Sequence, residues 1–266
     1  MTVLELTQRY EQQHLEAEWR YDLRIRYIPS DFMKEFQDDR TTMLYFYQQV
    51  RSDFMQQYAS KVSDGMALQL GCLEIRRFFK DMNPNGLEKK SNFELLEKDV
   101  GLDQFFSREL IDSMKPKQLR RMIQQTFQGY STLKQDQCMV KFFTTLAQCY
   151  SFTQESFACQ LVVDLVIGPD GISQHTENST PIYLAKFSQV RTQYILSSKY
   201  LLSSTLQPLS VSTSSLAVAE NMADLIDGYC RLEGCTESSR YCHSFSSRCG
   251  PNIPNRGQSK SDCSVY

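Results

Sequence analysis

The residues best suited to metal chemistry lie near the C-terminus of the chain: Cys235, Cys242, His243 and Cys249. Thiolates and imidazoles bind zinc, but a zinc knuckle places two thiolates about two to four residues apart so that both reach one tetrahedral ion. Here six residues separate each successive pair of cysteines. We therefore predict no metal site and no cofactor, while zinc binding or thiol catalysis by this segment stays open as an alternative.

Other groups that catalyse reactions are too scattered to predict an active site. The histidines are His14, His175 and His243, and none has a Ser, Cys or carboxylate constellation near it in the sequence. The segment IGPDGI indicates a hairpin turn and lacks the spacing and the lysine of a phosphate-binding loop. A kinase catalytic-loop motif is also missing. We predict that this chain is not an enzyme.

A cluster of four basic residues stands beside a predicted helix start: Lys115, Lys117, Arg120 and Arg121. The last three are spaced i, i+3 and i+4, so they share one helix face. Such a cluster is suited to an anionic headgroup, because each charge contributes about 1 kcal/mol near an anionic membrane. From composition alone, a solvated helix face without a ligand is the favoured alternative.

Two adjacent aromatic residues, Phe78 and Phe79, end another predicted helix. Neighbouring side chains on a helix point about 100° apart, so both rings cannot face one core. One of them, together with Met82, is a candidate for an apolar surface that contacts a partner. Absorption of both rings by core and loop is the alternative that the local pattern favours.

Two helical segments, 41–58 and 63–79, must position these groups. The second is apolar on two stripes, which is typical of a helix in the centre of a bundle. One stripe holds Met66, Leu70 and Leu73, and the other holds Leu68, Cys72, Ile75 and Phe79. Further helices are predicted after a capping box at Ser91–Glu94, from Pro116, and over 134–150. Residues 39–150 are thus predicted to form a helical bundle.

After Tyr150 the pattern changes to short β-rich runs at 161–168, 180–187, 189–196 and 207–213. A helix capped by Ser215 closes this part at Leu232. We predict an α+β chain whose second domain, 155–232, is a β-sandwich with a C-terminal helix. Residues 233–266 show little periodicity and predict a tail without regular structure. Near the N-terminus, the alternation over Trp19–Tyr27 predicts a half-buried strand or extended segment within a connection at 19–38.

Composition further limits the classes of protein to which this chain could belong. Charged residues nearly balance, with a formal net charge of -2 in 266 residues, which does not favour a nucleic-acid partner. We find neither an apolar run long enough for a membrane span nor a signal peptide. Nine cysteines are an odd number, and Cys72, Cys138, Cys149 and Cys159 stand at wide spacings in apolar contexts, as buried free thiols do. These features predict a cytoplasmic protein.

Several segments together resemble one known family. WRYDLRIRY, TMLYFYQQVRSDFM, GMALQLGCLEIRRFF, LEKKSNFELLEKDVGL, LRRMIQQTF and AENMADLIDGYCRL are similar to the FERM region of the focal adhesion kinase family over about residues 1–232. The resemblance implies that 1–18 end a ubiquitin-like first lobe. It makes 39–150 an acyl-CoA-binding-protein-like helical second lobe and 155–232 a pleckstrin-homology-like third lobe.

The resemblance also implies a function. In that family the FERM region docks on the kinase domain and holds it inactive, and acidic phospholipids or protein partners relieve the inhibition. It assigns kinase-domain docking to Phe79 and Met82, and phosphoinositide binding to Lys115, Lys117, Arg120 and Arg121. The expected location is the cytoplasm and the inner face of the plasma membrane at focal adhesions, with the nucleus as a further site. A cytoskeletal-membrane adaptor that binds receptor tails is the alternative.

The sequence departs from the family pattern in two places within the third lobe. A Trp-containing stretch expected between Cys159 and Asp164 is absent, and 191–206 is shorter than in the family. We therefore expect a shortened or lost strand and unpaired sheet edges. Neither the kinase domain nor most of the first lobe is present in the sequence, and we interpret the chain as a truncated or variant product.

Overall fold

A computed structural model describes residues 22–159, 163–177, 179–196, 199–204, 208–234 and 240–243. The described chain divides into two compact units. Helices α2 to α8 lie in the first unit, and strands β5 to β8 with helix α9 lie in the second. Strands β1, β2 and β4 contribute residues to both units. The predicted first lobe at 1–18 lies outside the described residues.

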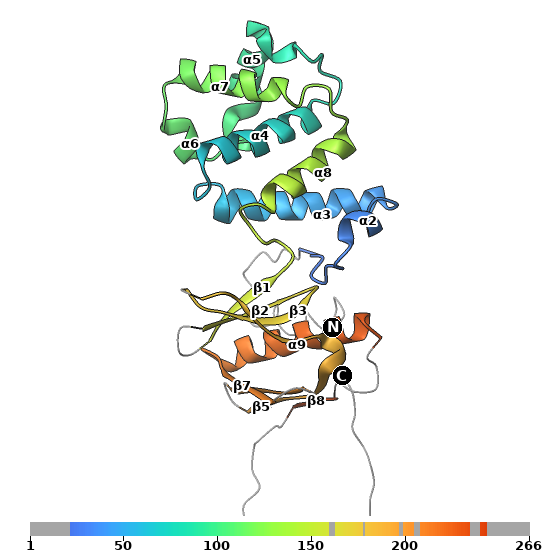
Figure 1. The fold of residues 1–266 in the computed structure, drawn as a ribbon. Coiled ribbons are helices and arrows are strands. Elements are labelled where there is room, and N and C mark those ends of the chain that lie inside the picture. Colours follow the sequence, from blue (N-terminus) through green and yellow to red (C-terminus); the bar gives the residue numbers. More distant parts are fainter. Residues whose placement is uncertain are drawn as a thin grey trace, which may run out of the picture. The chain divides into compact units, whose positions relative to one another are not determined.

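The first unit is a helical bundle, as the sequence predicts for 39–150 (Figure 1). Its α-helices are α2 (Phe32–Glu35), α3 (Arg40–Asp53), α4 (Asp64–Phe78), α5 (Lys90–Leu95), α6 (Arg108–Asp112), α7 (Pro116–Gln128) and α8 (Gln135–Leu146). Two π-helical turns, η2 (Phe54–Tyr58) and η4 (Leu96–Gly101), continue α3 and α5, and short 3-10 turns occupy η3 (Gly86–Glu88) and η5 (Leu102–Gln104).

Helix α4 is buried on two sides, which confirms the prediction of a central helix. Leu70 and Leu73 belong to one core with α3 and α8, and Met66 packs at its margin. The other predicted stripe, with Leu68, Cys72 and Ile75, belongs to a second core with α5 and α7. A helix that is apolar nearly all round must be covered on both faces, and α7 and α8 provide that cover (Figure 1).

The helix starts show ordinary capping chemistry, and the start of α7 at Pro116 was predicted. Asp39 accepts the Thr41 and Thr42 amides before α3, and Ser63 accepts the Met66 amide before α4. The predicted capping box at Ser91–Glu94 is wrong. Helix α5 begins at Lys90, two residues earlier than a cap at Ser91 requires, so Ser91 lies inside its first turn.

The earlier start of α5 has a visible cause. Asn92 is the residue that holds the helix to the turn before it, because its Nδ2 donates to the Gly86 carbonyl over 2.9 Å. Lys89 is extended and takes the N-cap place. At the other end Gly101 has a φ of 92°, a conformation open to glycine at little cost, and the chain turns away there.

The segment before the bundle is extended but is not a strand. Residues 22–29 have no regular secondary structure, and Gln49 on α3 holds Ile25 by accepting its amide and donating to its carbonyl, both over 2.8 Å. The predicted alternation fails at Leu23, which is 81% exposed, whereas Ile28 is buried. Side-chain amide contacts of this kind fix the segment without a neighbouring strand. Trp19 and Tyr21 lie outside the described residues.

The β-rich part contains two four-stranded sheets, in the orders β1-β2-β3-β4 and β7-β6-β5-β8. The first sheet holds β1 (Glu155–Cys159), β2 (Val163–Gly168), β3 (Gly171–His175) and β4 (Ile182–Ala185). The second holds β5 (Val190–Leu196), β6 (Lys199–Ser204), β7 (Pro208–Ser212) and β8 (Arg240–His243), and a 3-10 turn, η6 (Phe187–Gln189), precedes β5. Helix α9 (Leu216–Leu232), capped by Ser215, packs against β5, β6 and η6.

Four strands differ from expectation. Strands β1, β3 and β6 were not predicted, because their short runs mix polar and apolar residues. No regular structure was expected after residue 232, but Arg240–His243 form β8. β8 pairs in parallel with β5, with Thr192 opposite Arg240. The shortened stretch after Cys159 still leaves β1 and β2 in place on either side. Strand pairing is a long-range effect, so local patterns indicate it weakly.

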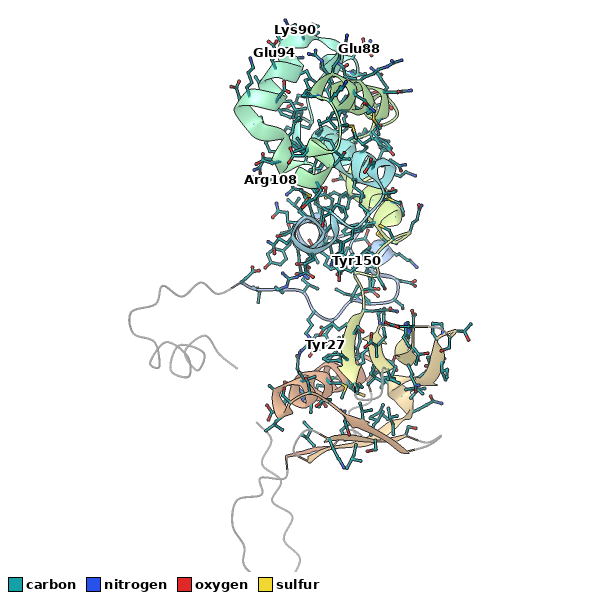
Figure 2. All side chains as sticks on the ribbon, turned by 90° about the vertical axis from the view of Figure 1, so that its left-hand side faces the viewer. Tyr27, Glu88, Lys90, Glu94, Arg108 and Tyr150 are labelled. Carbon is teal, nitrogen blue, oxygen red and sulfur yellow. The ribbon has the colours of Figure 1, made fainter. Side chains whose placement is uncertain are left out.

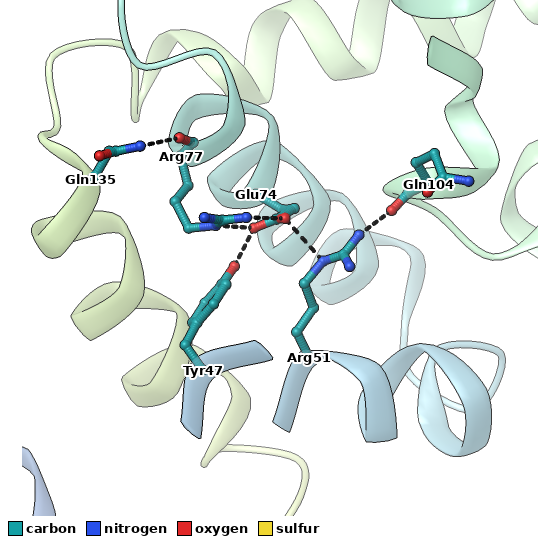
Figure 3. A network of polar contacts seen from close by, with 6 residues as sticks. All are labelled: Tyr47, Arg51, Glu74, Arg77, Gln104 and Gln135. Atoms are coloured by element: carbon teal, nitrogen blue, oxygen red, sulfur yellow. Dashed lines mark hydrogen bonds and ion pairs between the residues drawn. The ribbon is translucent and has the colours of Figure 1, made fainter. Parts of the chain in front are cut away.

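A buried carboxylate lies where α3, α4 and α8 meet (Figure 3). Glu74 on α4 is only 3% exposed, and Arg77 binds it with two hydrogen bonds of 2.7 and 2.8 Å. The hydroxyl of Tyr47 donates to the same carboxylate, and Nε of Arg51 lies 3.1 Å from it. Charge-assisted, bidentate hydrogen bonds of this kind are the strong ones in proteins.

The network extends beyond the carboxylate. Arg77 also lies over the ring of Tyr47, 5.0 Å from its centroid, and Nε2 of Gln135 on α8 donates to the Arg77 carbonyl over 3.0 Å. Arg51 donates to the Gln104 carbonyl. Burial, and then the charge of Glu74, raise the pKa of Tyr47 well above its ordinary value, so the phenol stays a hydrogen-bond donor. The network therefore joins α3, α4, η5 and α8.

Replacing the buried carboxylate tests its contribution. In Glu74→Gln, Arg51 and Arg77 lose their counter-charge inside the bundle, and we expect the free energy of unfolding to fall by about 3 kcal/mol. Urea unfolding followed by circular dichroism measures the change. The control Glu94→Gln removes an exposed carboxylate 3.6 Å from Lys90 and should cost less than about 0.5 kcal/mol. Equal losses in both variants would contradict the role of Glu74.

Two glycines of α4 form a second matched test. A Cβ on Gly71 would lie 2.1 Å from the Phe106 ring and 2.7 Å from the Phe105 carbonyl, whereas one on Gly65 would meet nothing within 4 Å. We expect Gly71→Ala to destabilise the chain by about 1–3 kcal/mol through overpacking. Gly65→Ala should stabilise it by about 0.5 kcal/mol, since the unfolded chain loses freedom. Thermal unfolding of the two variants checks the opposite signs.

Candidate functional site

The end of α4 presents an aromatic surface, but a different residue is exposed from the one expected. Phe78 is 54% exposed, whereas Phe79 and Met82 are partly buried and pack against the second core. The Phe78 ring contacts Phe79 edge-on, with centroids 4.9 Å apart, and contacts Phe105 edge-on at 5.9 Å. Adjacent rings do point apart here, so one ring reaches solvent while the other lines the core.

Arg76 fixes the loop that follows this aromatic end. Its Nη1 donates to the Met82 carbonyl over 2.7 Å, and its Nε donates to the Leu133 carbonyl over 2.9 Å. Both bonds are charge-assisted and lie in partly buried surroundings, where they are stronger than in water. The sequence pattern did not single out Arg76. Its role depends on two carbonyls that are distant or irregular in the sequence, and no local signal shows them.

The four basic residues predicted as an anion site lie together at the start of α7. Lys115 is the N-cap, and Lys115, Lys117 and Arg121 are exposed. None of these three forms an ion pair within the part of the chain that the structure describes. Arg120 differs, because its guanidinium lies 4.6 Å from the centroid of the Phe93 ring, on α5. Three of the four cations are therefore available to a ligand, and the fourth also contributes to packing.

Helix α7 is held firmly beneath these cations. Leu119 and Ile123 are buried in the second core, and Nε2 of Gln124 donates to the Leu87 carbonyl over 2.7 Å. The first turn of α7 contains no acidic residue. Cations at the positive end of a helix dipole are unfavourable for helix stability, and an anion bound there would relieve the repulsion. The arrangement suits a negatively charged partner.

Acidic groups lie close to this surface as well. Figure 2 shows Glu88, Lys90 and Glu94 gathered at one end of the helical unit. Glu88 accepts from Nε2 of Gln128 over 2.8 Å, and with Arg121 it lines a shallow depression of about 360 Å³. Glu94 is paired with Lys90. The Glu88 carboxylate limits the reach of the positive field on the Arg121 side.

The described thiols offer no catalytic or metal site. Cys72, Cys138, Cys149, Cys159 and Cys230 are all free, and burial raises the pKa of Cys72 and raises that of Cys138 to about 11. The expectation that the first four are buried is wrong for Cys149, which is exposed, and Cys159, which is half-buried. No group of metal-ligating side chains gathers among the described residues. The side chains of the C-terminal cysteines and of His243 lie outside them.

One polar pair in β3 resembles part of a catalytic site. Ser173 Oγ lies 3.1 Å from His175 Nε2, because residues two apart in a strand face the same side. Among the described residues no carboxylate is hydrogen-bonded to His175, so the pair lacks the orienting acid of a nucleophilic triad. No described helix combines the length and the apolar character that crossing a bilayer requires.

Three family models match this chain in succession. The FERM N-terminal domain matches residues 1–29, the FERM central domain matches 33–157, and the FAK1/PYK2 FERM domain C-lobe matches 156–240. None of them is a catalytic domain. The chain is also 25% identical over 254 residues to mouse FERM and PDZ domain-containing protein 1, covering 86% of this chain. The human protein of that name is 28% identical over 121 residues, or 45% of this chain.

The chain spans 16% of the mouse relative and 7% of the human one. Among solved structures, the myosin VII MyTH4-FERM MF2 domain of Dictyostelium discoideum superposes with a TM-score of 0.63 at 15% identity, over 86% of this chain and 46% of that one. The FERM and C-terminal domain complex of Drosophila Merlin gives a TM-score of 0.54 at 12% identity, over 74% and 66%. These likenesses show the fold. The chain therefore carries a FERM domain, and its residues 156–240 match the model of the FAK1/PYK2 FERM domain C-lobe.

Proposed function

We propose that this chain is the regulatory FERM module of a focal-adhesion-type non-receptor tyrosine kinase. In this proposal it binds the kinase domain, in cis or in trans, and keeps it inactive. Anionic phospholipids of the inner leaflet, receptor tails or other signalling proteins then relieve the inhibition. The observation that carries the proposal is the match of residues 156–240 to the FAK1/PYK2 C-lobe model. Many protein families contain FERM domains, but this model describes the C-lobe of one kinase family.

The geometry of the helical lobe supports this proposal. Phe79 and Met82 flank the exposed Phe78 at the end of α4, and Arg76 fixes the loop that carries Met82. Aromatic and apolar side chains at the end of a helix are the kind that a domain interface uses as anchors. The Drosophila Merlin structure is a precedent for a FERM region in complex with another domain, its C-terminal domain.

Finer assignments belong to the same proposal. The segments FFKDM and YASKVSDGMALQLGCLE resemble most the proline-rich, calcium-responsive member of the family. We infer a cytoplasmic protein that associates peripherally with the plasma membrane at focal adhesions and also enters the nucleus. Coupling of adhesion to kinase activity would follow from the two surfaces, one for the kinase domain and one for anionic lipid.

The alternative is a cytoskeletal-membrane adaptor that binds receptor tails through the third lobe. The similarity to FERM and PDZ domain-containing protein 1 and to a myosin FERM region favours it. A pull-down that offers receptor tails and an isolated tyrosine kinase domain to the full chain separates the two functions. Retention of receptor tails alone would favour the adaptor.

The aromatic surface predicts kinase-domain binding. Phe79→Ala combined with Met82→Ala should weaken binding of the full chain to the isolated kinase domain about tenfold or more, because anchors of this kind dominate interfaces. Biolayer interferometry measures the affinity, and circular dichroism checks that the helices persist. Phe78→Ala tests the exposed ring separately, and Leu95→Ala, an exposed leucine on α5, is the control. Unchanged binding in both Phe78 and Phe79/Met82 variants would remove this surface from the proposal.

The basic residues predict salt-sensitive retention on vesicles that contain phosphoinositide. Replacing Lys115, Lys117 and Arg121 by Gln should reduce retention about tenfold or more, at about 1 kcal/mol for each charge. Arg120 is left in place because it packs on Phe93. The charge-matched control replaces Lys34, Lys61 and Lys199, which are exposed elsewhere. Co-sedimentation at two salt concentrations gives the result, and equal losses in both sets would mean nonspecific attraction.

A further inference from the structure

A pocket of about 660 Å³ opens in the helical unit, and its lining includes neither the aromatic end of α4 nor the basic residues of α7. Three parts of the bundle form its walls: the end of α2 with the start of α3, the turn between α7 and α8, and one face of α8. All three parts belong to one compact unit. Pockets of a few hundred Å³ with mixed walls are the size that holds small organic ligands.

The floor of the pocket is apolar and continuous with the first core. Met43 is buried at the bottom, and Phe36, Leu133 and Val140 line the sides while partly exposed. Phe36 and Leu133 pack against the same core as Met43. Apolar area on a cavity floor is unfavourable while it is exposed to water. Covering it is favourable by roughly 25 cal/mol for each Å² that is buried. A ligand with an apolar chain or ring would gain that energy.

The rim of the pocket is charged. Arg40 on α3 spans the mouth, with its Nε 3.3 Å from Asp136 and its Nη2 donating to Gln135 over 3.3 Å, both residues on α8. Lys141 lines the same rim, is exposed and forms no ion pair within the part of the chain that the structure describes. Arg40 and Lys141 against Asp136 leave one formal positive charge at the mouth. The rim therefore complements a single negative charge.

We propose that this pocket binds an amphipathic organic anion, a fatty carboxylate of medium chain length. Its hydrocarbon chain covers Met43, Leu133 and Val140, and its carboxylate faces the ammonium of Lys141 beside Arg40. Asp39 does not oppose the ligand, because its carboxylate is used by the amides of Thr41 and Thr42 and it does not line the pocket. The residues that line the pocket include none of those assigned to the kinase domain or to phosphoinositide.

Binding of decanoate below its micelle concentration tests the proposal on the full chain. Isothermal titration calorimetry should show saturable binding to the native chain, and hydrogen exchange should show added protection in α3 and α8. Lys141→Gln should lower the affinity for decanoate about fivefold, the effect of one partly exposed charge. Decanol, with the same chain and no charge, should bind about fivefold more weakly than decanoate and should not respond to Lys141→Gln.

Filling the cavity is the second arm. Val140→Trp should abolish binding of both decanoate and decanol while the urea midpoint stays near that of the native chain, and Thr144→Trp replaces it if that variant does not fold. Equal decanoate affinity in the filled and native chains would overturn the site. No saturable binding to the native chain would overturn it too. Equal binding of decanol and decanoate would overturn the assignment of an anion.

Discussion

Glu74 is a carboxylate in the middle of a helix that has apolar residues on both sides. Water does not reach it, so the surrounding side chains must supply its hydrogen bonds and its counter-charge, and Tyr47, Arg51 and Arg77 do so. These partners come from α3 and α4, and their outer contacts reach Gln104 and Gln135. A buried charge that is fully paired tolerates little displacement of its partners. The position of α4 against α3 and α8 is therefore tightly defined.

The functional surfaces of the helical lobe depend on that position. The helix that carries Glu74 ends at Phe78. Arg76, two residues after Glu74, donates hydrogen bonds to the carbonyls of Met82 and Leu133. The aromatic surface and the wall of the α8 pocket are thus fixed by one arginine. On the other side of α4, the second core seats α7, whose start bears Lys115 and Lys117. Binding groups placed on such rigid supports lose little entropy when a partner arrives.

The three candidate surfaces differ in the chemistry they present. The end of α4 bears an exposed aromatic ring, the start of α7 bears exposed cations, and the pocket beside α8 has apolar and charged lining residues. An exposed aromatic anchor suits another folded domain, exposed cations suit a charged surface, and a lined cavity suits a small molecule. The three surfaces that we propose as binding sites therefore differ in the kind of partner that each would suit.

Local sequence patterns determined much of this protein. The two stripes of 63–79 predicted a doubly buried helix, and Pro116 marked a helix start. The spacing of Lys117, Arg120 and Arg121 placed them on one face. Each of these depends on residues within about one or two helical turns, so the sequence contains the whole signal. The change of pattern after Tyr150 likewise predicted the β-rich part and the helix from Ser215.

Other features were decided only by tertiary structure. Phe105 and the second core decide which of Phe78 and Phe79 is exposed. The role of Arg76 depends on two carbonyls outside its own helical turn. The sequence around Glu74 does not distinguish it from a glutamate on a helix surface, because its partners Tyr47 and Arg51 lie on another helix. The pocket between α3 and α8 joins residues about a hundred positions apart. Periodicity predicts which face of a helix is apolar, but packing decides what covers that face and what remains open.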